Sequence, residues 1–329
     1  MIPSPLHFSF IPAGGIETAS SRIRVYTLYN ALVQQGVQGK IGYSLKANVL
    51  FFQKKVTMKN LLQARLAKAR GCVIMYDVDD FGRSLWYWVS KKHFREMLSV
   101  ADIVTVCSAG QLDLLISEYK ISGKAAAIPN AIDYFPPAPV RLAQRKREKL
   151  RIVWFGNGDN FCLFERYLNA LRAIRHSEIV AIVNEAAIPE FSRRYSFVHF
   201  LPWRMHDFVS NLQSCDLACL MHDGTVYDTA KGNNRMISSI TWGVPAVVSR
   251  TPEYERTAKE SGIEYAVFSN EEELYAVIER LRSPASREQY LEAAQSVIWS
   301  RYAADIIARQ YLDLVDQFIS ERRNRLSRR

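Results

Sequence analysis

The stretch "AKGNNRMISSITWGVPAVVS", residues 230–249, says more about the fold than any other part of the chain. It ends as a short apolar strand that is entered through the tight turn Gly243-Val244-Pro245. Cations at a helix N-terminus oppose the helix dipole, so their presence there indicates a bound anion. The amphipathic segment before the turn opens with four residues that we interpret as part of such an anion site: Lys231, Asn233, Asn234 and Arg235.

Short apolar runs alternate with helical patterns on both sides of this stretch. This order predicts an α/β protein with two Rossmann-like, doubly wound parallel sheets, each covered by helices on both faces. Three prolines and a run of charge between 134 and 149 separate the two series, as expected of a linker. We therefore expect a first domain over 1–135, a linker over 136–149, a second domain over 150–300 and a C-terminal crossover helix with a basic tail over 301–329.

The composition is that of an ordinary globular protein. The chain has 329 residues, 48% hydrophobic and 23% charged. No apolar run approaches the ~18 residues that a membrane helix needs, and "MIPSPLHFSFIPAGG" has no charged leader, so we expect no signal peptide. The five cysteines form no C-x-x-C pair, and we interpret them as small, mostly buried residues of a reduced cytoplasmic protein.

The positive charge is concentrated rather than spread evenly. The net charge is +10, and much of it lies in 54–70, 141–149 and the tail 322–329. The tail lacks interleaved aromatic residues, so a nucleic-acid partner is not expected. An anionic membrane surface and simple solvation are the two remaining interpretations of the tail. The expected location is the cytoplasm, with the inner face of the membrane as a peripheral site.

Several segments, taken in order, resemble the GT-B-fold glycosyltransferases, in particular family 4 of the bacterial surface-polysaccharide type. They are "RIRVYTLYNALVQQG", "ADIVTVCS", "AIPNAID", "LRIVWFGNG", "CDLACLMHDGTVYDTAKGNNRMISSITWGVPAVVS" and "IWSRYAADIIARQYLDLVDQF". The resemblance implies transfer of a sugar from a nucleotide-diphosphate donor held mainly by the second domain, with the acceptor held mainly by the first across a cleft. The class implied is a hexosyl- or deoxyhexosyltransferase, either retaining or inverting, without a metal or other cofactor. The partners implied are a nucleotide sugar and a saccharide or lipid-linked acceptor.

The sequence departs from this family at two places. Typical members carry an arginine just after the glycine of the second domain, where this chain has Asn157, and Lys231 and Arg235 are the candidates to replace it. Typical retaining members also have two glutamates eight positions apart before the Gly-x-Pro turn. Those slots hold Ala230 and Ser238 here, so only a weaker hydrogen bond from Ser238 is expected.

Further donor-binding candidates follow strands of the second domain. A glycine-flanked turn lets the backbone approach a phosphate closely, or it is a tight turn and no more. Trp203 is either a surface on which the nucleotide base stacks or a core residue. The candidates are Gly156, Asn157, Gly158, Trp203 and His222.

The first domain holds two further clusters. Asp77, Asp79 and Asp80 follow the apolar run "CVIM", and neighbouring carboxylates suppress each other's ionisation, so one of them is a candidate general base, with Asp79 or Asp80 preferred. The alternative is helix capping. Gly14, Gly15, Arg22 and Arg24 are candidates for contacting the acceptor or a phosphate, with only one arginine expected to point inward.

The leading interpretation is therefore a glycosyltransferase of cell-surface polysaccharide or glycoconjugate synthesis. The alternative, suggested by the missing glutamates and arginine, is a catalytically weak GT-B protein that binds nucleotide sugars or acts as a scaffold. A nicotinamide dehydrogenase is not indicated, because no G-x-G-x-x-G follows a strand.

Overall fold

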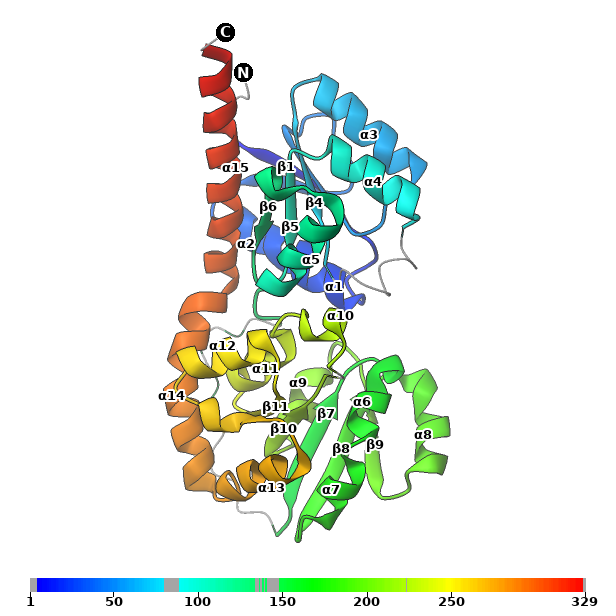
Figure 1. Ribbon diagram of the computed structural model, residues 1–329, viewed down its shortest axis with the longest axis vertical. Helices are drawn as coiled ribbons and strands as arrows, with labels where there is room; N and C mark the ends of the chain where they lie inside the picture. The colour runs from blue at the N-terminus through cyan, green and yellow to red at the C-terminus, as the bar shows by residue number, and fades with distance from the viewer. Residues whose placement is uncertain are drawn as a thin grey trace. The chain divides into compact units, whose positions relative to one another are not determined.

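The computed structural model describes residues 5–79, 89–133, 136, 138, 140, 148–222 and 224–327. The chain divides into two compact units (Figure 1). Unit 1 consists of Met1–Asp133, Ala230–Gly232 and Tyr302–Arg329, and unit 2 consists of Tyr134–Thr229 and Asn233–Arg301. The end of the chain therefore returns to the unit in which the chain begins.

Unit 1 contains a six-stranded parallel sheet with the order β2-β1-β3-β4-β5-β6. Its strands are β1 (His7–Ile11), β2 (Gln38–Ile41), β3 (Val49–Gln53), β4 (Val73–Asp77), β5 (Ile103–Val106) and β6 (Ala125–Ala127). Its helices are α1 (Ala19–Ser21), α2 (Leu28–Gln34), α3 (Met58–Ala69), α4 (Lys91–Val100), α5 (Ala109–Tyr119) and α15 (Ala304–Ser327), and the π-helical turn Arg22–Thr27 joins α1 to α2.

Alternate residues of the central strands of unit 1 enter opposite layers of the core. Phe51 of β3 packs with residues of α2 and α15, whereas its neighbour Phe52 packs with residues of α3, α4 and α5. Met75 and Tyr76 of β4 divide in the same way. Because successive side chains of a strand point to opposite faces, a strand that is buried on both faces has a continuous apolar sequence. The predicted doubly wound sheet is confirmed.

Unit 2 contains a second six-stranded parallel sheet, with the order β12-β11-β10-β7-β8-β9. Its strands are β7 (Leu150–Phe155), β8 (Ser177–Val183), β9 (Val198–Pro202), β10 (Leu217–Leu220), β11 (Ala246–Ser249) and β12 (Val267–Phe268). Its helices are α6 (Phe161–Glu165), α7 (Leu168–Ala173), α8 (Ile188–Arg194), α9 (Phe208–Gln213), α10 (Val226–Thr229), α11 (Asn234–Thr241), α12 (Pro252–Glu260), α13 (Glu271–Arg280) and α14 (Pro284–Tyr302).

The turn between α11 and β11 forms as its sequence predicts. Gly243 has a φ of +81°, a conformation that costs glycine little, and its N–H donates to the carbonyl of Ile240 at 3.0 Å. Val244 N–H donates to the carbonyl of Ser239 at 3.0 Å, which closes the end of the helix. Pro245 then leads directly into the buried strand β11.

The amphipathic pattern of the sequence predicts one long last helix over about 286–325, but the structure has two helices, α14 and α15, interrupted at Ala303. The carbonyl of Tyr302 accepts a hydrogen bond from Ile132 N–H at 2.8 Å instead of continuing the helical pattern. The next turn starts again with Ile307 N–H donating to Ala303 O at 3.0 Å. Helix α14 belongs to unit 2 up to Arg301, and α15 belongs to unit 1.

A buried ion pair joins the elements of unit 1. The guanidinium of Arg24 binds both carboxylate oxygens of Asp77, at 2.5 and 3.2 Å, and donates to the carbonyl of Ile128 at 2.7 Å. Asp77 also accepts from Thr105 at 2.7 Å and from Tyr311 of α15 at 3.4 Å. Burial by itself lowers the pKa of Arg24, but Asp77, Tyr311 and Asp79 together raise the pKa well above the ordinary arginine value.

The expectation that only one arginine of the first helix points inward is wrong. Arg22 is also buried, and its guanidinium binds Asp133 at 2.9 to 3.1 Å. The two arginines reach carboxylates in different parts of the sequence, so both sides of this helical turn are covered.

No helix within the described ranges combines the length and the apolar character needed to cross a membrane.

Replacing Arg24 by methionine should lower the free energy of unfolding by about 3–5 kcal/mol, because Asp77 would stay buried without its cation. Arg65→Met is the matched control, since Arg65 is half-exposed and pairs with Glu96 at the surface, where a pair contributes about 0–1 kcal/mol. Urea denaturation followed by circular dichroism measures both variants. Equal losses in the two variants would contradict the role assigned to the buried pair.

Candidate functional site

Arg235 lies at the point where the sheet of unit 2 changes direction. The chain runs outward from β7 through β8 and β9 on one side and from β10 through β11 and β12 on the other, so the switch lies between β7 and β10. Arg235 donates to the carbonyl of Phe155, the last residue of β7, at 3.4 Å. It also donates to the carbonyl of Met221, just after β10, at 3.2 Å. Ligands of open α/β sheets bind at this place, outside the carboxyl ends of the strands.

Gly156 leaves room for the buried ring of Trp154 and lies next to the Arg235 side chain. A Cβ atom on this glycine would lie 2.9 Å from the ring of Trp154 and 3.7 Å from Nη1 of Arg235. The first distance is too short for any side chain. A glycine is therefore required here, and it brings bare backbone next to a guanidinium.

His222 and Asp228 form a buried pair beside this arginine. Nδ1 of His222 lies 3.0 Å from Oδ2 of Asp228, and both side chains are less than a tenth exposed. On the other side of the ring, Nε2 lies 3.4 Å from Nη2 of Arg235. Ser249, at the end of β11, accepts from the backbone N–H of His222 at 2.9 Å. His222 was a candidate from the sequence, whereas Asp228 was missed.

The partners of His222 fix its tautomer. A guanidinium can only donate hydrogen bonds, so Nε2 of His222 must accept and carries no proton. Nδ1 then carries the proton and donates it to the Asp228 carboxylate. The pair therefore holds a neutral imidazole that presents a lone pair to Arg235 and restrains the guanidinium from one side.

The N-terminus of α11 differs from the sequence expectation. The helix begins at Asn234, so Lys231 lies before the helix and not in its first turn, and the contact pattern assigns Ala230–Gly232 to unit 1. Asn233 is buried and donates its side-chain amide to Thr257 of α12 at 2.7 Å, which fixes where the helix starts. Arg235 is thus the cation of the first turn, and Lys231 is a separate feature.

Three side-chain polar atoms of α11 are buried and have no hydrogen-bond partner among the described residues. They are Oδ1 of Asn234, Oγ of Ser238 and Oγ1 of Thr241. Buried polar atoms in this state usually bind water or a ligand. Ser238 is only 4% exposed, so a ligand would reach its hydroxyl only after the atoms that cover it move.

The glycine turn after β7 is held by side chains of its own unit. Asn184, which follows β8, accepts from Gly158 N–H at 2.7 Å, so this N–H is already engaged. Asn157 bonds to Asp159, both as an acceptor from its N–H at 3.4 Å and as a donor to its carboxylate at 3.2 Å. Gly156 is therefore the part of the turn nearest to Arg235.

Trp203 lies at the same edge of the sheet, directly after β9. Its backbone N–H donates to the carbonyl of Val183, at the end of β8, at 2.6 Å. The ring is partly exposed and lies 6.5 Å from that of Phe208. It is not a fully buried core residue.

The carboxyl edge of unit 1 is organised around Gln53, which sequence reasoning missed. Its order β2-β1-β3 places the switch between β1 and β3. Oε1 of Gln53 accepts from Ala13 N–H at 2.9 Å and from Ser21 at 2.8 Å, and Ser21 accepts from Gly14 N–H at 3.0 Å. Nε2 of Gln53 is buried without a partner among the described residues. A polar pair, Gln53 and Lys54, directly after "VLFF" was the available signal.

The glycines of this edge differ in the space around them. A Cβ atom on Gly14 would lie 2.4 Å from Oγ1 of Thr18, whereas one on Gly15 would meet nothing within 4 Å. Gly14 therefore has no room for a side chain next to Thr18, whereas Gly15 borders open space.

The acidic cluster of unit 1 separates into different environments. Asp77 is fully buried in the ion pair with Arg24. Asp79 is 5% exposed and follows two residues later at the same edge of the sheet. Lys54, also buried, donates its backbone N–H to the carbonyl of Asp77 at 2.9 Å. Asp80 lies outside the described residues.

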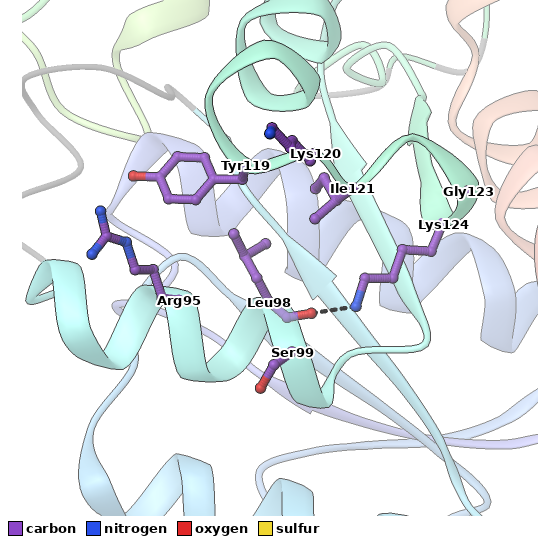
Figure 2. Close-up of a pocket in the computed structure, with 8 residues that line it drawn as sticks. All are labelled: Arg95, Leu98, Ser99, Tyr119, Lys120, Ile121, Gly123 and Lys124. Carbon is purple, nitrogen blue, oxygen red and sulfur yellow. Dashed lines mark hydrogen bonds between the residues drawn. The ribbon is translucent and has the colours of Figure 1, made fainter.

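Two hollows lie away from these edges. One, of about 490 Å³, is lined by Arg95, Tyr119 and Lys120 among others, at the ends of α4 and α5 (Figure 2). Lys124 there donates to the carbonyls of Leu98 and Ala101 and closes α4, and burial lowers the pKa of its ammonium group. The other, of about 480 Å³, lies at the start of β7 and β8. Helices α4 and α5 lead into β5 and β6, so the first pocket lies at the amino ends of these strands, as the second does for β7 and β8. Neither pocket is lined by a candidate residue.

No group of three or more metal-ligating side chains is placed to hold a metal ion in the part of the chain that the structure describes.

Comparison with known proteins finds the fold but no relative at the level of sequence. No family model matches the chain, and no curated protein matches it. An α-glucosyltransferase solved with UDP and a 13-mer DNA containing an HMU base is similar with a TM-score of 0.67 and 8% identity over 95% of this chain and 100% of that one. HepE from Anabaena, solved with UDP and glucose, gives 0.66 and 12% identity over 95% and 100%. A glycosyltransferase from Rickettsia africae gives 0.64 and 12% over 96% and 99%.

These likenesses show that the chain has the GT-B fold, with two Rossmann-like parallel sheets and a long C-terminal helix.

The tautomer of His222 can be tested by NMR on protein labelled with ¹⁵N-histidine. Among the six histidines, His222 should show a protonated Nδ1 and an unprotonated Nε2 at pH 7, because Arg235 faces Nε2. The signal is assigned by its loss in His222→Gln, and the exposed His199 serves as the internal control. A proton on Nε2 of His222 would contradict the assignment.

Proposed function

We propose that this protein is a glycosyltransferase that moves a sugar from a nucleotide-diphosphate donor to a saccharide or lipid-linked acceptor. The acceptor class and a role in cell-surface polysaccharide or glycoconjugate synthesis follow from the resemblance to family 4. The observation that carries the proposal is the position of Arg235, a cation restrained at the switch point of the unit 2 sheet.

The chemistry of glycosyl transfer explains why a restrained cation is needed. When the glycosidic bond breaks, negative charge develops on the diphosphate that leaves. A guanidinium held beside the backbone of Gly156 can stabilise this charge without having to reorganise, through its positive charge and through the N–H groups that Phe155, Met221 and His222 do not use. The N-terminus of α11 adds its positive end. No metal or other cofactor is required by this proposal.

Arg235 lies in α11, the second helix after β10. It would replace the arginine that family 4 members carry just after the glycine that follows β7, here Gly156. Its carbonyl contacts at the ends of both strands support this exchange, because they place the cation at the same edge of the sheet by another route. The missing glutamates at Ala230 and Ser238 leave the retaining or inverting outcome open.

The remaining donor contacts are assigned around this cation. Trp203 would stack on the nucleotide base with its exposed face, and Ser238 or Asn234 would supply a buried polar contact to the ribose. His222 and Asp228 would act through Arg235 as positioning residues. Asn157 and Gly158 would shape the loop after β7, and Asn233 would fix the start of α11, since their polar groups are bound within unit 2. Lys231 is a second candidate cation.

The acceptor is assigned to the carboxyl edge of unit 1. Asp79 is the preferred general base, with Asp80 as its neighbour in sequence, because Asp77 is committed to Arg24. Gln53 and the Gly14-Gly15 loop would contact a hydroxyl-rich acceptor. Arg22 and Arg24 would contribute by shaping this edge, since both guanidinium groups hold carboxylates.

Arg235→Ala should weaken binding of UDP, or of whichever nucleoside diphosphate raises the melting temperature most, by about 1.5–3 kcal/mol, roughly 10- to 150-fold in Kd. Calorimetry on the purified protein measures this loss. Arg282→Ala is the control, because Arg282 follows α13 and pairs with Glu279 away from the carboxyl edge. Unchanged affinity in Arg235→Ala would overturn the proposed phosphate contact.

Asp79→Asn should lower turnover by about 10²- to 10⁴-fold, the usual contribution of a general base, while the Kd for the donor nucleotide stays as in the wild type. Product formation is followed by release of the nucleoside diphosphate. Asp77→Asn is the comparison, because it should act first on stability through the ion pair. Loss of donor binding together with turnover in Asp79→Asn would point to a structural role instead.

The second candidate is a GT-B protein that binds nucleotide sugars without turning them over. The departures at Asn157, Ala230 and Ser238 favour it. It predicts calorimetric binding of a sugar nucleotide but no nucleotide release with any sugar nucleotide and acceptor mixture tested, whereas a glycosyltransferase releases the nucleoside diphosphate.

A further inference from the structure

Helix α3 of unit 1 is apolar on two sides. Its buried side consists of Leu61, Ala64 and Ala67, which pack into the core against the sheet. The opposite side exposes Met58, Leu62 and Leu66, with exposed fractions of 50%, 52% and 62%. Residues spaced by four lie on one face of a helix, so these three side chains form one stripe. We call it the α3 stripe. The helix lies on the outside of unit 1, next to α4 (Figure 1).

The surroundings of the stripe carry charge of one sign. The segment 54–70 contains six basic residues and no aspartate or glutamate: Lys54, Lys55, Lys59, Arg65, Lys68 and Arg70. Lys54 is buried, while Lys55, Lys59, Arg65 and Arg70 are exposed. Among the residues that the structure describes, Glu96 pairs with Arg65 and Asp102 pairs with Lys68, each at 3.0 Å. The face keeps a positive excess.

The end of α15 reaches the C-terminal end of α3. Arg322 donates to the carbonyl of Gly71, the residue that follows the last turn of α3, at 3.2 Å. Arg323 and Arg325 are exposed on the same helix end, and Glu321 pairs with Arg325 at 3.6 Å. The basic end of α15 therefore adds positive charge next to the end of α3, although the two helices pack in opposite layers of the core.

The loop before β3 also exposes an apolar residue. Arg70, at the end of α3, lies 3.4 Å from the hydroxyl of Tyr43 in this loop. Leu45, two residues after Tyr43, is 73% exposed, the largest exposed fraction among the large hydrophobic residues described.

We propose that this face docks on a lipid bilayer that contains anionic lipid, with the α3 stripe entering the headgroup layer. A row of exposed Leu and Met side chains bordered by Lys and Arg is the surface that an interfacial helix presents to a membrane. The uncompensated positive charge favours anionic headgroups over a second copy of this chain, which would bring the same charge to the contact. The inference adds a location to the proposed function but does not depend on catalysis.

Binding of the full chain to vesicles of phosphatidylcholine with about one third phosphatidylglycerol tests the proposal by co-sedimentation. The wild-type protein should bind these vesicles and not pure phosphatidylcholine vesicles. Leu62→Gln with Leu66→Gln should weaken binding at least about tenfold, because the apolar contribution is lost while glutamine keeps the helix. Arg323→Gln with Arg325→Gln should weaken it by about fivefold for each arginine.

A fluorescent label locates the contact. NBD attached to Leu66→Cys in a Cys162→Ser background, which removes the exposed native thiol, should show a blue-shifted and stronger emission on anionic vesicles. The same label at Tyr275→Cys, a half-exposed position of unit 2, is the matched control and should not change.

Melting temperatures of the glutamine variants confirm that they are folded. The proposal is overturned if wild-type protein binds neither kind of vesicle, or if the leucine variants bind as tightly as wild type. It is equally overturned if light scattering shows a dimer that the leucine substitutions dissociate without vesicles, because the stripe would then bind a second copy. Loss of vesicle binding with nucleotide binding intact separates this inference from the proposed function.

Discussion

The ion pair between Arg24 and Asp77 holds unit 1 together. It ties the π-helical turn at the start of the chain to the end of β4, and through Thr105 and Tyr311 to β5 and the C-terminal helix. The remaining Arg24 nitrogen binds the carbonyl of Ile128 after β6. Segments that are far apart in the sequence thus share one buried charge pair, and a buried charge tolerates little displacement of its partner. The carboxyl edge of the sheet is fixed as a consequence.

The same principle, a cation restrained by oxygen and nitrogen acceptors, appears at the candidate site of unit 2. Arg235 has two carbonyls below it and the His222 ring beside it, and the ring is oriented by Asp228. None of these described partners is an anion in direct contact with the guanidinium, whereas Arg24 contacts the Asp77 carboxylate directly. This difference is the reason that we propose Arg235, and not Arg24, as the phosphate contact.

The sequence predicted the alternation of strands and helices because the spacing of apolar residues and the residues that form turns are local properties of the chain. The apolar runs "LHFSFI", "CVIMYDV" and "LRIVWF" each contain a strand, and the turn at Gly243 lies where expected. The predictions for the last helix and for the start of α11 were wrong because of long-range hydrogen bonds. The contact of Tyr302 with Ile132 divides the last helix, and the bond of Asn233 with Thr257 moves the start of α11 past Lys231. Neither partner is visible in the local pattern.

For the site, the sequence by itself determined which residue types follow the strands, and hence that Gly156, His222 and Arg235 would collect at one edge of a parallel sheet. Only the tertiary structure decided their roles. It paired His222 with Asp228, gave Arg24 to Asp77 and Arg22 to Asp133, and placed Gln53 at the switch point of unit 1. The residue type determines which hydrogen bonds a side chain can donate or accept. Its actual partner depends on which segments, distant in the sequence, pack next to it in the folded chain.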